Sequence, residues 1–209
     1  MNVTIIGTGN MARGIGSVLV RGGNQVTVLG KETDDAEAVV SDLESDGAAR
    51  SGRFGDDIAD DVVVLAVYYP DARAAVEQYG DALSGKVVVD ITNPVNETFD
   101  DLVTPPDSSA AQELASSAPG ARLVKAFNTT FAGTLGGGQV SGEPLDVFIA
   151  GDDEDAKGTV AELAGGGGLR PVDVGPLKRA RELEAMGLLH MSVQDGLGTG
   201  FGSALKIVS

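Results

Sequence analysis

The chain has 209 residues, of which 42% are hydrophobic, so it is long enough for one compact domain with a sizeable core. It contains no cysteine and one histidine, which excludes disulfides and thiolate metal sites and leads us to predict no metal centre. Aspartate and glutamate total 31 against 15 lysines and arginines, a formal net charge of −16. Such a charge repels phosphates and anionic lipid headgroups, so we expect neither nucleic acid nor a membrane as partner.

The acidic excess is spread along the chain rather than gathered in a tail. Two interpretations stay open: an ordinary solvated surface with carboxylates at helix N-termini, and adaptation to high salt, which screens self-repulsion. The sequence has no apolar run of about 18 residues, and its first residues lack the basic segment of a signal peptide. We therefore expect a cytoplasmic protein.

Apolar runs and helical periodicities alternate along the chain. Short β-branched runs predict strands at residues 2–7, 25–29, 62–67, 86–91, 122–127 and 145–150. Apolar residues at helical spacing predict helices near residues 11–21, 34–45, 72–79, 110–117, 151–164 and 180–191. The alternation predicts an α/β fold, a Rossmann doubly wound, mostly parallel sheet with a small C-terminal helical extension. We expect a dinucleotide-binding domain over residues 1–150, and an extension over residues 151–209 that closes the substrate pocket and ends in a loose, glycine-rich tail.

The first predicted strand leads directly into the G-x-G-x-x-A form of the dinucleotide-binding motif, made of Gly7, Thr8, Gly9, Asn10, Met11 and Ala12. Gly7 permits a tight turn, Gly9 lets a pyrophosphate approach the backbone, and Ala12 lets the helix pack close to the sheet. The pyrophosphate would lie at the positive end of the helix. Because the motif lies between a clean strand and a helix, it predicts a dinucleotide cofactor.

The end of the second strand indicates which dinucleotide is bound. NAD-preferring sites place an acidic residue there for the ribose 2′-hydroxyl, but this chain has Gly30 followed by Lys31. A missing carboxylate beside an ammonium group favours the 2′-phosphate of NADP. Glu32, Asp34 and Asp35 crowd the same loop and oppose that phosphate. On balance we predict NADP.

Three further segments follow later strands. Val67 and Tyr68 follow the third strand, Asn93 and Pro94 follow the fourth, and Asn128 follows the fifth. Doubly wound sheets bind ligands at the carboxyl ends of their strands, so we expect these segments to wall a nicotinamide ring. Asn93 and Asn128 would offer it, or the ribose, amide hydrogen bonds. A plain strand-ending turn is the alternative for each segment.

The sequence offers no constellation for acid–base catalysis. His190 lies in a leucine-rich helix, and we interpret it as a packed or interfacial residue rather than a proton donor. Tyr68 and Tyr69 lack the spacing to lysine found in short-chain dehydrogenases, and no G-x-S-x-G motif occurs. We therefore predict no catalytic side chain, and a hydride that moves between two bound cofactors or to a flavin-like acceptor. That reaction needs positioning more than proton transfer.

Four segments carry a resemblance to a known family: residues 7–16, 90–100, 124–135 and 151–189. In this order they resemble the NADPH-dependent reductases related to F420H2:NADP oxidoreductase, over nearly the whole chain. The run from Gly168 to Leu177, followed by a helix with Arg181 and Glu184, is fairly specific to that group. The membrane ferric reductases of metazoans carry a similar cytoplasmic domain.

The resemblance implies NADP on the loop of residues 7–12, with its 2′-phosphate near Gly30 and Lys31. It implies a nicotinamide beside Asn93 and the segment from Asn128 to Ala132. It also implies that the deazaflavin coenzyme F420 stacks over this ring in a pocket partly closed by the C-terminal segment. Hydride would pass directly between the two rings, without a protein general acid.

Two departures from the family pattern keep alternatives open. Archaeal members that use the deazaflavin show a Ser-Arg pair where this chain has Lys31 and Glu32, and a histidine where it has Asn128. The asparagine form resembles a broader branch, whose acceptor is a flavin such as FMN or FAD, or another small molecule. We predict an NADP-dependent oxidoreductase with coenzyme F420. A flavin or ferric reductase with a pocket lined by Tyr68, Phe127 and Phe131, and an NADP-binding sensor without turnover, are the alternatives.

The last predicted helix also bears on assembly. C-terminal helices of this kind often pack against a second subunit, so we predict a homodimer. Its candidate interface is the apolar face formed by Leu183, Met186, Leu189 and His190. Packing of this face within its own subunit is the alternative.

Overall fold

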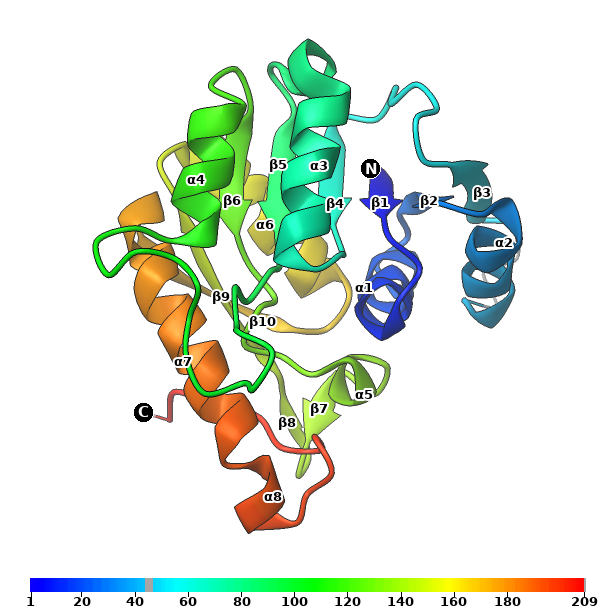
Figure 1. The fold of residues 1–209 in the computed structure, drawn as a ribbon. Helices are drawn as coiled ribbons and strands as arrows, with labels where there is room; N and C mark the ends of the chain where they lie inside the picture. Colours follow the sequence, from blue (N-terminus) through cyan, green and yellow to red (C-terminus); the bar gives the residue numbers. More distant parts are fainter. Residues whose placement is uncertain (44–46, 209) are drawn as a thin grey trace.

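The computed structural model describes residues 1–43 and 47–208 and has one eight-stranded sheet with helices on both faces (Figure 1). The strands lie in the order β10-β9-β6-β5-β4-β1-β2-β3. Neighbouring strands are parallel throughout, except that β6 and β9 are antiparallel. This confirms the predicted Rossmann-like sheet. The strands are β1 (Asn2–Ile6), β2 (Gln25–Gly30), β3 (Ala49–Arg53), β4 (Val62–Leu65), β5 (Val87–Asp90), β6 (Arg122–Lys125), β9 (Asp146–Gly151) and β10 (Arg170–Gly175).

Helices cover both faces of the sheet, as Figure 1 shows. One face is packed by α1 (Asn10–Arg21), α2 (Thr33–Asp42) and α6 (Glu154–Gly166). The other is packed by α3 (Tyr69–Tyr79) and α4 (Ala110–Ser117), with α7 (Ala180–Ser192) beside α4. Because β4 and β5 are covered on both sides, every residue in them is buried, which explains their unbroken apolar runs in the sequence.

The hydrophobic core extends across the expected domain boundary at residue 150. One cluster contains residues of β1 and α1 together with Val147 and Ile149 of β9 and Val160 of α6. β10 lies beside β9 in the same sheet. Residues on both sides of position 150 therefore share one core, and the boundary does not separate two cores.

Several short elements were not predicted. β3 is a polar edge strand, Ala-Arg-Ser-Gly-Arg, and lacks the apolar run that marks the buried strands. A short helix α5 (Ala132–Leu135) and a hairpin of β7 (Gln139–Val140) with β8 (Glu143–Pro144) have too few residues for any periodicity. Another short helix, α8 (Gln194–Leu197), reaches into the first two residues of the glycine-rich tail expected over residues 196–202. The helix predicted over 34–45 ends at Asp42, and positions 44 and 45 lie outside the described residues.

The apolar face of α7 is largely covered within its own chain. Leu183 and His190 are each 4% exposed, and Leu183 packs against Phe148 and Ala150 of β9. Leu189, in contrast, is 64% exposed. Two of the four residues offered for a dimer interface are thus buried in the subunit, and the homodimer stays a prediction.

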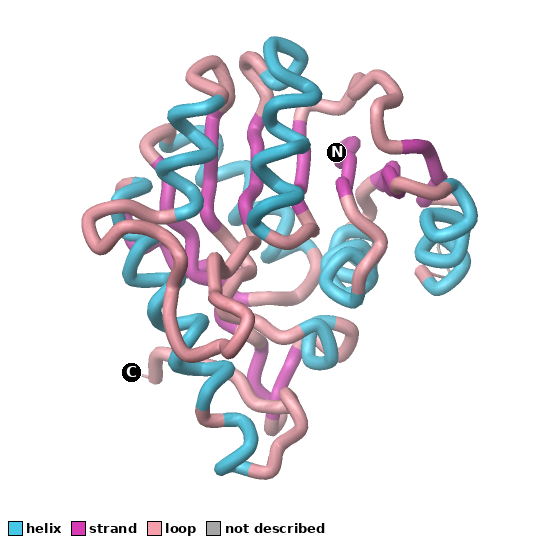
Figure 2. Tube along the Cα trace, viewed as in Figure 1, coloured by secondary structure: helices cyan, strands magenta, loops and turns pink. Residues whose placement is uncertain are grey.

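Loops gather below the carboxyl edge of the parallel strands (Figure 2), the edge at which β1, β2, β4, β5 and β6 end. The order of the strands reverses between β1 and β4, so the connections that follow them run in opposite directions and leave a crevice there. Among the described residues no helix combines the length and apolarity needed to cross a membrane.

Candidate cofactor site

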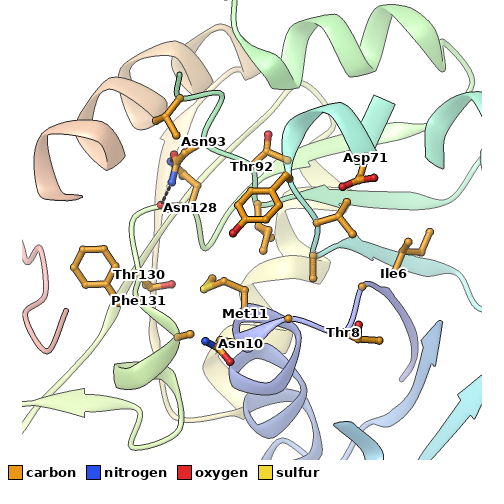
Figure 3. Close-up of a pocket in the computed structure, with 18 of the residues that line it drawn as sticks. Ile6, Thr8, Asn10, Met11, Asp71, Thr92, Asn93, Asn128, Thr130 and Phe131 are labelled. Atoms are coloured by element: carbon orange, nitrogen blue, oxygen red, sulfur yellow. Dashed lines mark hydrogen bonds between the residues drawn. The ribbon is translucent and has the colours of Figure 1, made fainter. Parts of the chain in front are cut away.

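A cavity of about 790 Å³ lies along this carboxyl edge (Figure 3). Its volume falls in the range of cofactor sites in proteins. The walls come from the loops that follow β1, β2, β4, β5 and β6, from α5, and from the chain around Met191 and Phe201. The cavity therefore occupies the place where doubly wound sheets bind their ligands.

The glycine loop of residues 7–11 lines the cavity where the strand order reverses, between β1 and β4. Gly7 has φ +125°, and a Cβ there would lie 2.2 Å from the carbonyl oxygen of Ala66, so no other residue fits. A Cβ at Gly9 would meet nothing within 4 Å, which leaves open space above the loop. α1 begins at Asn10 with no acidic side chain in its first turn, so its free N–H groups present a positive end. This loop fits a pyrophosphate.

The end of β2 has no room for the acidic residue of an NAD site. A Cβ at Gly30 would lie 2.6 Å from the carbonyl oxygen of Glu32 and 2.9 Å from Cγ2 of Thr8. The adjacent Lys31 extends to the far wall, where its ammonium lies 2.8 Å from Oδ1 of Asp71 at the start of α3. The ammonium group of Lys31 and the carboxylates of Asp35 and Asp71 line the cavity at this end.

An amide pair lies at the opposite end of the cavity. Nδ2 of Asn128 donates to Oδ1 of Asn93 at 2.9 Å, drawn as a dashed line in Figure 3, and to the carbonyl of Leu183 at 2.8 Å. Nδ2 of Asn93 donates to the carbonyl of Asn128 at 2.8 Å. Because Asn128 donates to two oxygen acceptors, the orientation of its amide is fixed by the network.

Polar atoms near this pair lack partners. Oδ1 of Asn128 and Oγ1 of Thr92 are buried and have no hydrogen-bond partner within residues 1–43 and 47–208, although both residues line the cavity. Buried polar atoms are rarely left unpaired in native proteins. A ligand with a carboxamide or hydroxyl group would satisfy them, so this end also fits a nicotinamide and its ribose.

A buried ion cluster lies directly behind the amide pair. The ammonium of Lys125 is 2.8 Å from Oδ2 of Asp90 and 2.8 Å from Oε1 of Glu184, and all three side chains are fully buried. Burial favours the neutral amine, but attraction to the two carboxylates raises the pKa of Lys125, so the lysine stays charged. Burial, with the negative charge of Asp90, raises the pKa of Glu184 although Lys125 acts to lower it.

This cluster connects four elements of the fold. Asp90 ends β5, Lys125 ends β6, and Glu184 comes from α7. Glu184 also accepts hydrogen bonds from the backbone N–H groups of Ala110 and Ala111, at 3.0 and 3.3 Å, in the first turn of α4. Asn93 lies three residues after Asp90, and Asn128 lies three residues after Lys125. Because the cluster fixes the ends of β5 and β6, it also fixes where both asparagines lie.

The turn between Lys125 and Asn128 is strained. Phe127 has φ 63°, a left-handed conformation that an aromatic residue rarely adopts, and its side chain is 2% exposed. Such strain concentrates at functional sites. The sequence led us to expect Tyr68, Phe127 and Phe131 as lining residues. Tyr68 and Phe131 do line the cavity, but Phe127 does not, because its side chain packs into the main core.

The C-terminal part of the chain supplies the last wall. Phe131 stacks on His190 with ring centroids 4.2 Å apart and meets Phe201 edge-on at 5.0 Å. Nε2 of His190 lies 2.8 Å from the hydroxyl of Ser203. Burial lowers the pKa of His190, and the ring is packed as expected. His190 therefore fixes the tail that carries Phe201.

The structure brings together most of the residues proposed from the sequence. Those that line the cavity are Gly7, Thr8, Gly9, Asn10, Met11, Lys31, Val67, Tyr68, Asn93, Asn128 and Ala132. Three others do not line it. Ala12 and Gly30 are buried beneath the loop, and the carbonyl of Pro94 accepts from the N–H of Val103 in a loop pairing.

Sequence reasoning missed other lining residues, among them Phe54, Asp71, Thr92, Phe99, Met191 and Phe201. Thr92 directly precedes Asn93 and Asp71 lies three residues after Tyr68, so the strand-end rule extended by up to three residues finds them. Met191 and Phe201 carry no local signal. No group of three or more His, Asp or Glu side chains placed to hold a metal ion occurs in the described part of the chain.

The fold and the cavity define a Rossmann-type dinucleotide-binding protein. The family model described as "NADP oxidoreductase coenzyme F420-dependent" matches residues 2–94. The F420-dependent NADP reductase of Methanocaldococcus jannaschii is 31% identical over 72% of this chain and 66% of its own length. A structure from Arthrobacter sp. FB24, assigned provisionally as an F420-dependent NADP reductase, superimposes with a TM-score of 0.87 at 26% identity over 99% of both chains. The chain is similar to F420-dependent NADP oxidoreductases in sequence over residues 2–94 and in fold over nearly its whole length.

A second relative has a different activity in its name. The metalloreductase STEAP3 of Rattus norvegicus is 31% identical over 89% of this chain. The chain spans 36% of the length of that protein and 66% of the archaeal reductase.

Proposed function

We propose that this protein transfers a hydride between NADP(H) and coenzyme F420. The observation that carries the proposal is a single cavity that combines a glycine loop fit for a pyrophosphate with unpaired buried acceptors at its other end. The match of residues 2–94 to the family model and the likeness to the archaeal reductase support it. NADP bound here supplies or accepts the hydride.

In this proposal the N–H groups from Gly7 to Met11 hold the pyrophosphate, and Lys31 holds the 2′-phosphate. Asn93 and Asn128 orient the nicotinamide, with the free Oδ1 of Asn128 accepting from its carboxamide. Val67, Tyr68 and Ala132 line the same cavity and limit how the ring can tilt. The tail with Phe201 excludes water from the hydride-transfer end.

The end of the cavity where the hydride acceptor would bind suits a flat, largely apolar ring. It is lined by Val95, Phe99, Phe131, Met191 and Phe201. Among the described residues that line the cavity, four have titratable side chains. Lys31, Asp35 and Asp71 lie at the other end, and the fourth is Tyr68. Positioning of two rings is therefore what this site offers, and that is what direct hydride transfer needs.

The test is anaerobic mixing of the protein with NADPH and oxidised coenzyme F420, followed by the deazaflavin absorbance. We expect rapid bleaching with NADPH and far slower bleaching with NADH. Tight NADPH binding with no bleaching would overturn the choice of acceptor. In that case the same protein is tested with FMN, FAD and ferric chelates, and failure with all of them would leave an NADP-binding sensor.

The second candidate is an NADPH-dependent flavin or ferric reductase. It is favoured by the likeness to the rat metalloreductase and by Asn128 in place of the histidine of archaeal deazaflavin users.

A cytoplasmic location and a homodimer complete the proposal. Sedimentation of the purified chain at several salt concentrations tests the dimer, which a constant monomer mass would contradict.

A further inference from the structure

An exposed ion pair bridges the cavity at the end of β2. Lys31 follows β2, and Asp71 lies in the first turn of α3, across the crevice between the two halves of the sheet. Their charged atoms are 2.8 Å apart, and the side chains are 75% and 42% exposed. Figure 3 shows Asp71 on the same side of the cavity as Ile6 and Thr8, far from the amide pair.

The bridge engages the one cation that lines this cavity in the described chain. Under the proposed function, on which this inference rests, Lys31 is the ammonium that meets the 2′-phosphate. An ammonium held by a carboxylate is less available to a phosphate, and the carboxylate itself repels the phosphate. Asp35, a second carboxylate that lines the cavity, adds to the repulsion.

We propose that Asp71 is a selectivity residue that competes with the 2′-phosphate for Lys31 and so limits the preference for NADPH over NADH. NADH has a neutral 2′-hydroxyl, so its binding leaves the Lys31–Asp71 pair in place. NADPH binding requires that Lys31 turn from Asp71 to the phosphate. The selectivity of the site is then limited by a carboxylate on α3, in addition to the residues at the end of β2.

The test compares Asp71→Asn with the wild type in titrations of NADPH and NADH at low salt. We expect the Kd for NADPH to fall about two- to fivefold, because exposed ion pairs are worth little, and the Kd for NADH to stay the same. Glu77→Gln is the matched control: it removes the same charge from the exposed side of the same helix, at a residue that does not line the cavity.

A double-mutant cycle with Lys31→Met shows whether Asp71 acts through Lys31. In the Lys31→Met background, Asp71→Asn should change the Kd for NADPH by less than about twofold, because the competition no longer exists. An equal gain in both backgrounds would indicate plain charge repulsion and overturn the competition. An unchanged or weakened affinity for NADPH in the single variant would also overturn it.

Failure of this inference is distinguishable from failure of the proposed function. If the wild type binds NADPH and bleaches coenzyme F420, but Asp71→Asn leaves the NADPH-to-NADH ratio unchanged, only the role of Asp71 falls. If Asp71→Asn weakens the binding of both NADPH and NADH, Asp71 accepts hydrogen bonds from the ribose hydroxyls of both dinucleotides, and the proposed competition is wrong.

Discussion

Lys31 at one end of the cavity and Lys125, buried behind the amide pair at the other end, each lie 2.8 Å from a carboxylate, yet their surroundings differ completely. Lys125 is fully buried between Asp90 and Glu184, whereas the side chain of Lys31 is 75% exposed beside Asp71. In water an ion pair forms and breaks at little cost, because solvent replaces the lost partner. In the interior neither ion can be solvated, so removal of one partner leaves the other uncompensated.

Because of this difference, the buried cluster and the exposed pair have different roles. The buried cluster fixes the ends of β5 and β6 and thereby the loops that carry Asn93 and Asn128. The exposed pair can rearrange when a ligand offers a better partner. One end of the site is therefore built for geometry and the other for choice of ligand.

The largest expected effect is on stability. Lys125→Met leaves two buried carboxylates without their cation, so we expect the free energy of unfolding to fall by about 3–5 kcal/mol. Urea unfolding measures it. Lys31→Met is the matched control and should change stability by less than about 1 kcal/mol. Equal losses in the two variants would contradict the comparison.

The next effect is on the rate of hydride transfer. Asn128→Ala removes the hydrogen bonds to Asn93 and to the carbonyl of Leu183, so the nicotinamide end loses its alignment. We expect the single-turnover rate to fall about 10- to 100-fold, with the Kd for NADPH changed less than about threefold. Asn2→Ala, at the opposite edge of the sheet, is the control. A loss confined to NADPH binding would show that Asn128 contributes affinity rather than alignment.

A smaller effect is expected on cofactor choice. Lys31→Met removes the cation nearest the end of β2, so the Kd for NADPH should rise about tenfold while that for NADH stays unchanged. Fluorescence titration of the reduced cofactors measures both. A parallel loss for NADH would mean that Lys31 contacts a part common to both dinucleotides.

The smallest effect concerns acidification. Burial lowers the pKa of His190 in the folded chain, so between that value and the ordinary value of about 6.5 the unfolded chain binds the extra proton. Stability should therefore fall as pH falls below about 6.5. The difference between wild type and His190→Gln, followed by thermal unfolding from pH 7.5 to 5.5, isolates this contribution. A difference that does not vary with pH would refute it.

Local sequence signals predicted the frame of this protein. The apolar runs of β1, β2, β4, β5 and β9 gave the strands, and α4 was predicted with the bounds that the structure has. These predictions succeeded because strands covered on both faces must be apolar throughout, which leaves a mark on consecutive residues. The glycine motif is equally local, since a turn and a helix start are formed by neighbours in the chain.

Edge and loop elements left no such mark. β3 is half exposed and polar, and the hairpin of β7 and β8 has two residues in each strand. Pairing with a neighbour in space, rather than local composition, makes these segments strands.

The sequence by itself therefore determined a doubly wound sheet, a dinucleotide loop after β1, and the absence of an acidic residue at Gly30. Only the tertiary structure decided which distant groups meet. It brought Glu184 to Lys125, Asp71 to Lys31, and Phe201 to Phe131. Contacts between residues 40 to 70 positions apart depend on how whole elements pack. Packing is fixed by the shape and burial of the assembled layers, which no short segment of sequence records.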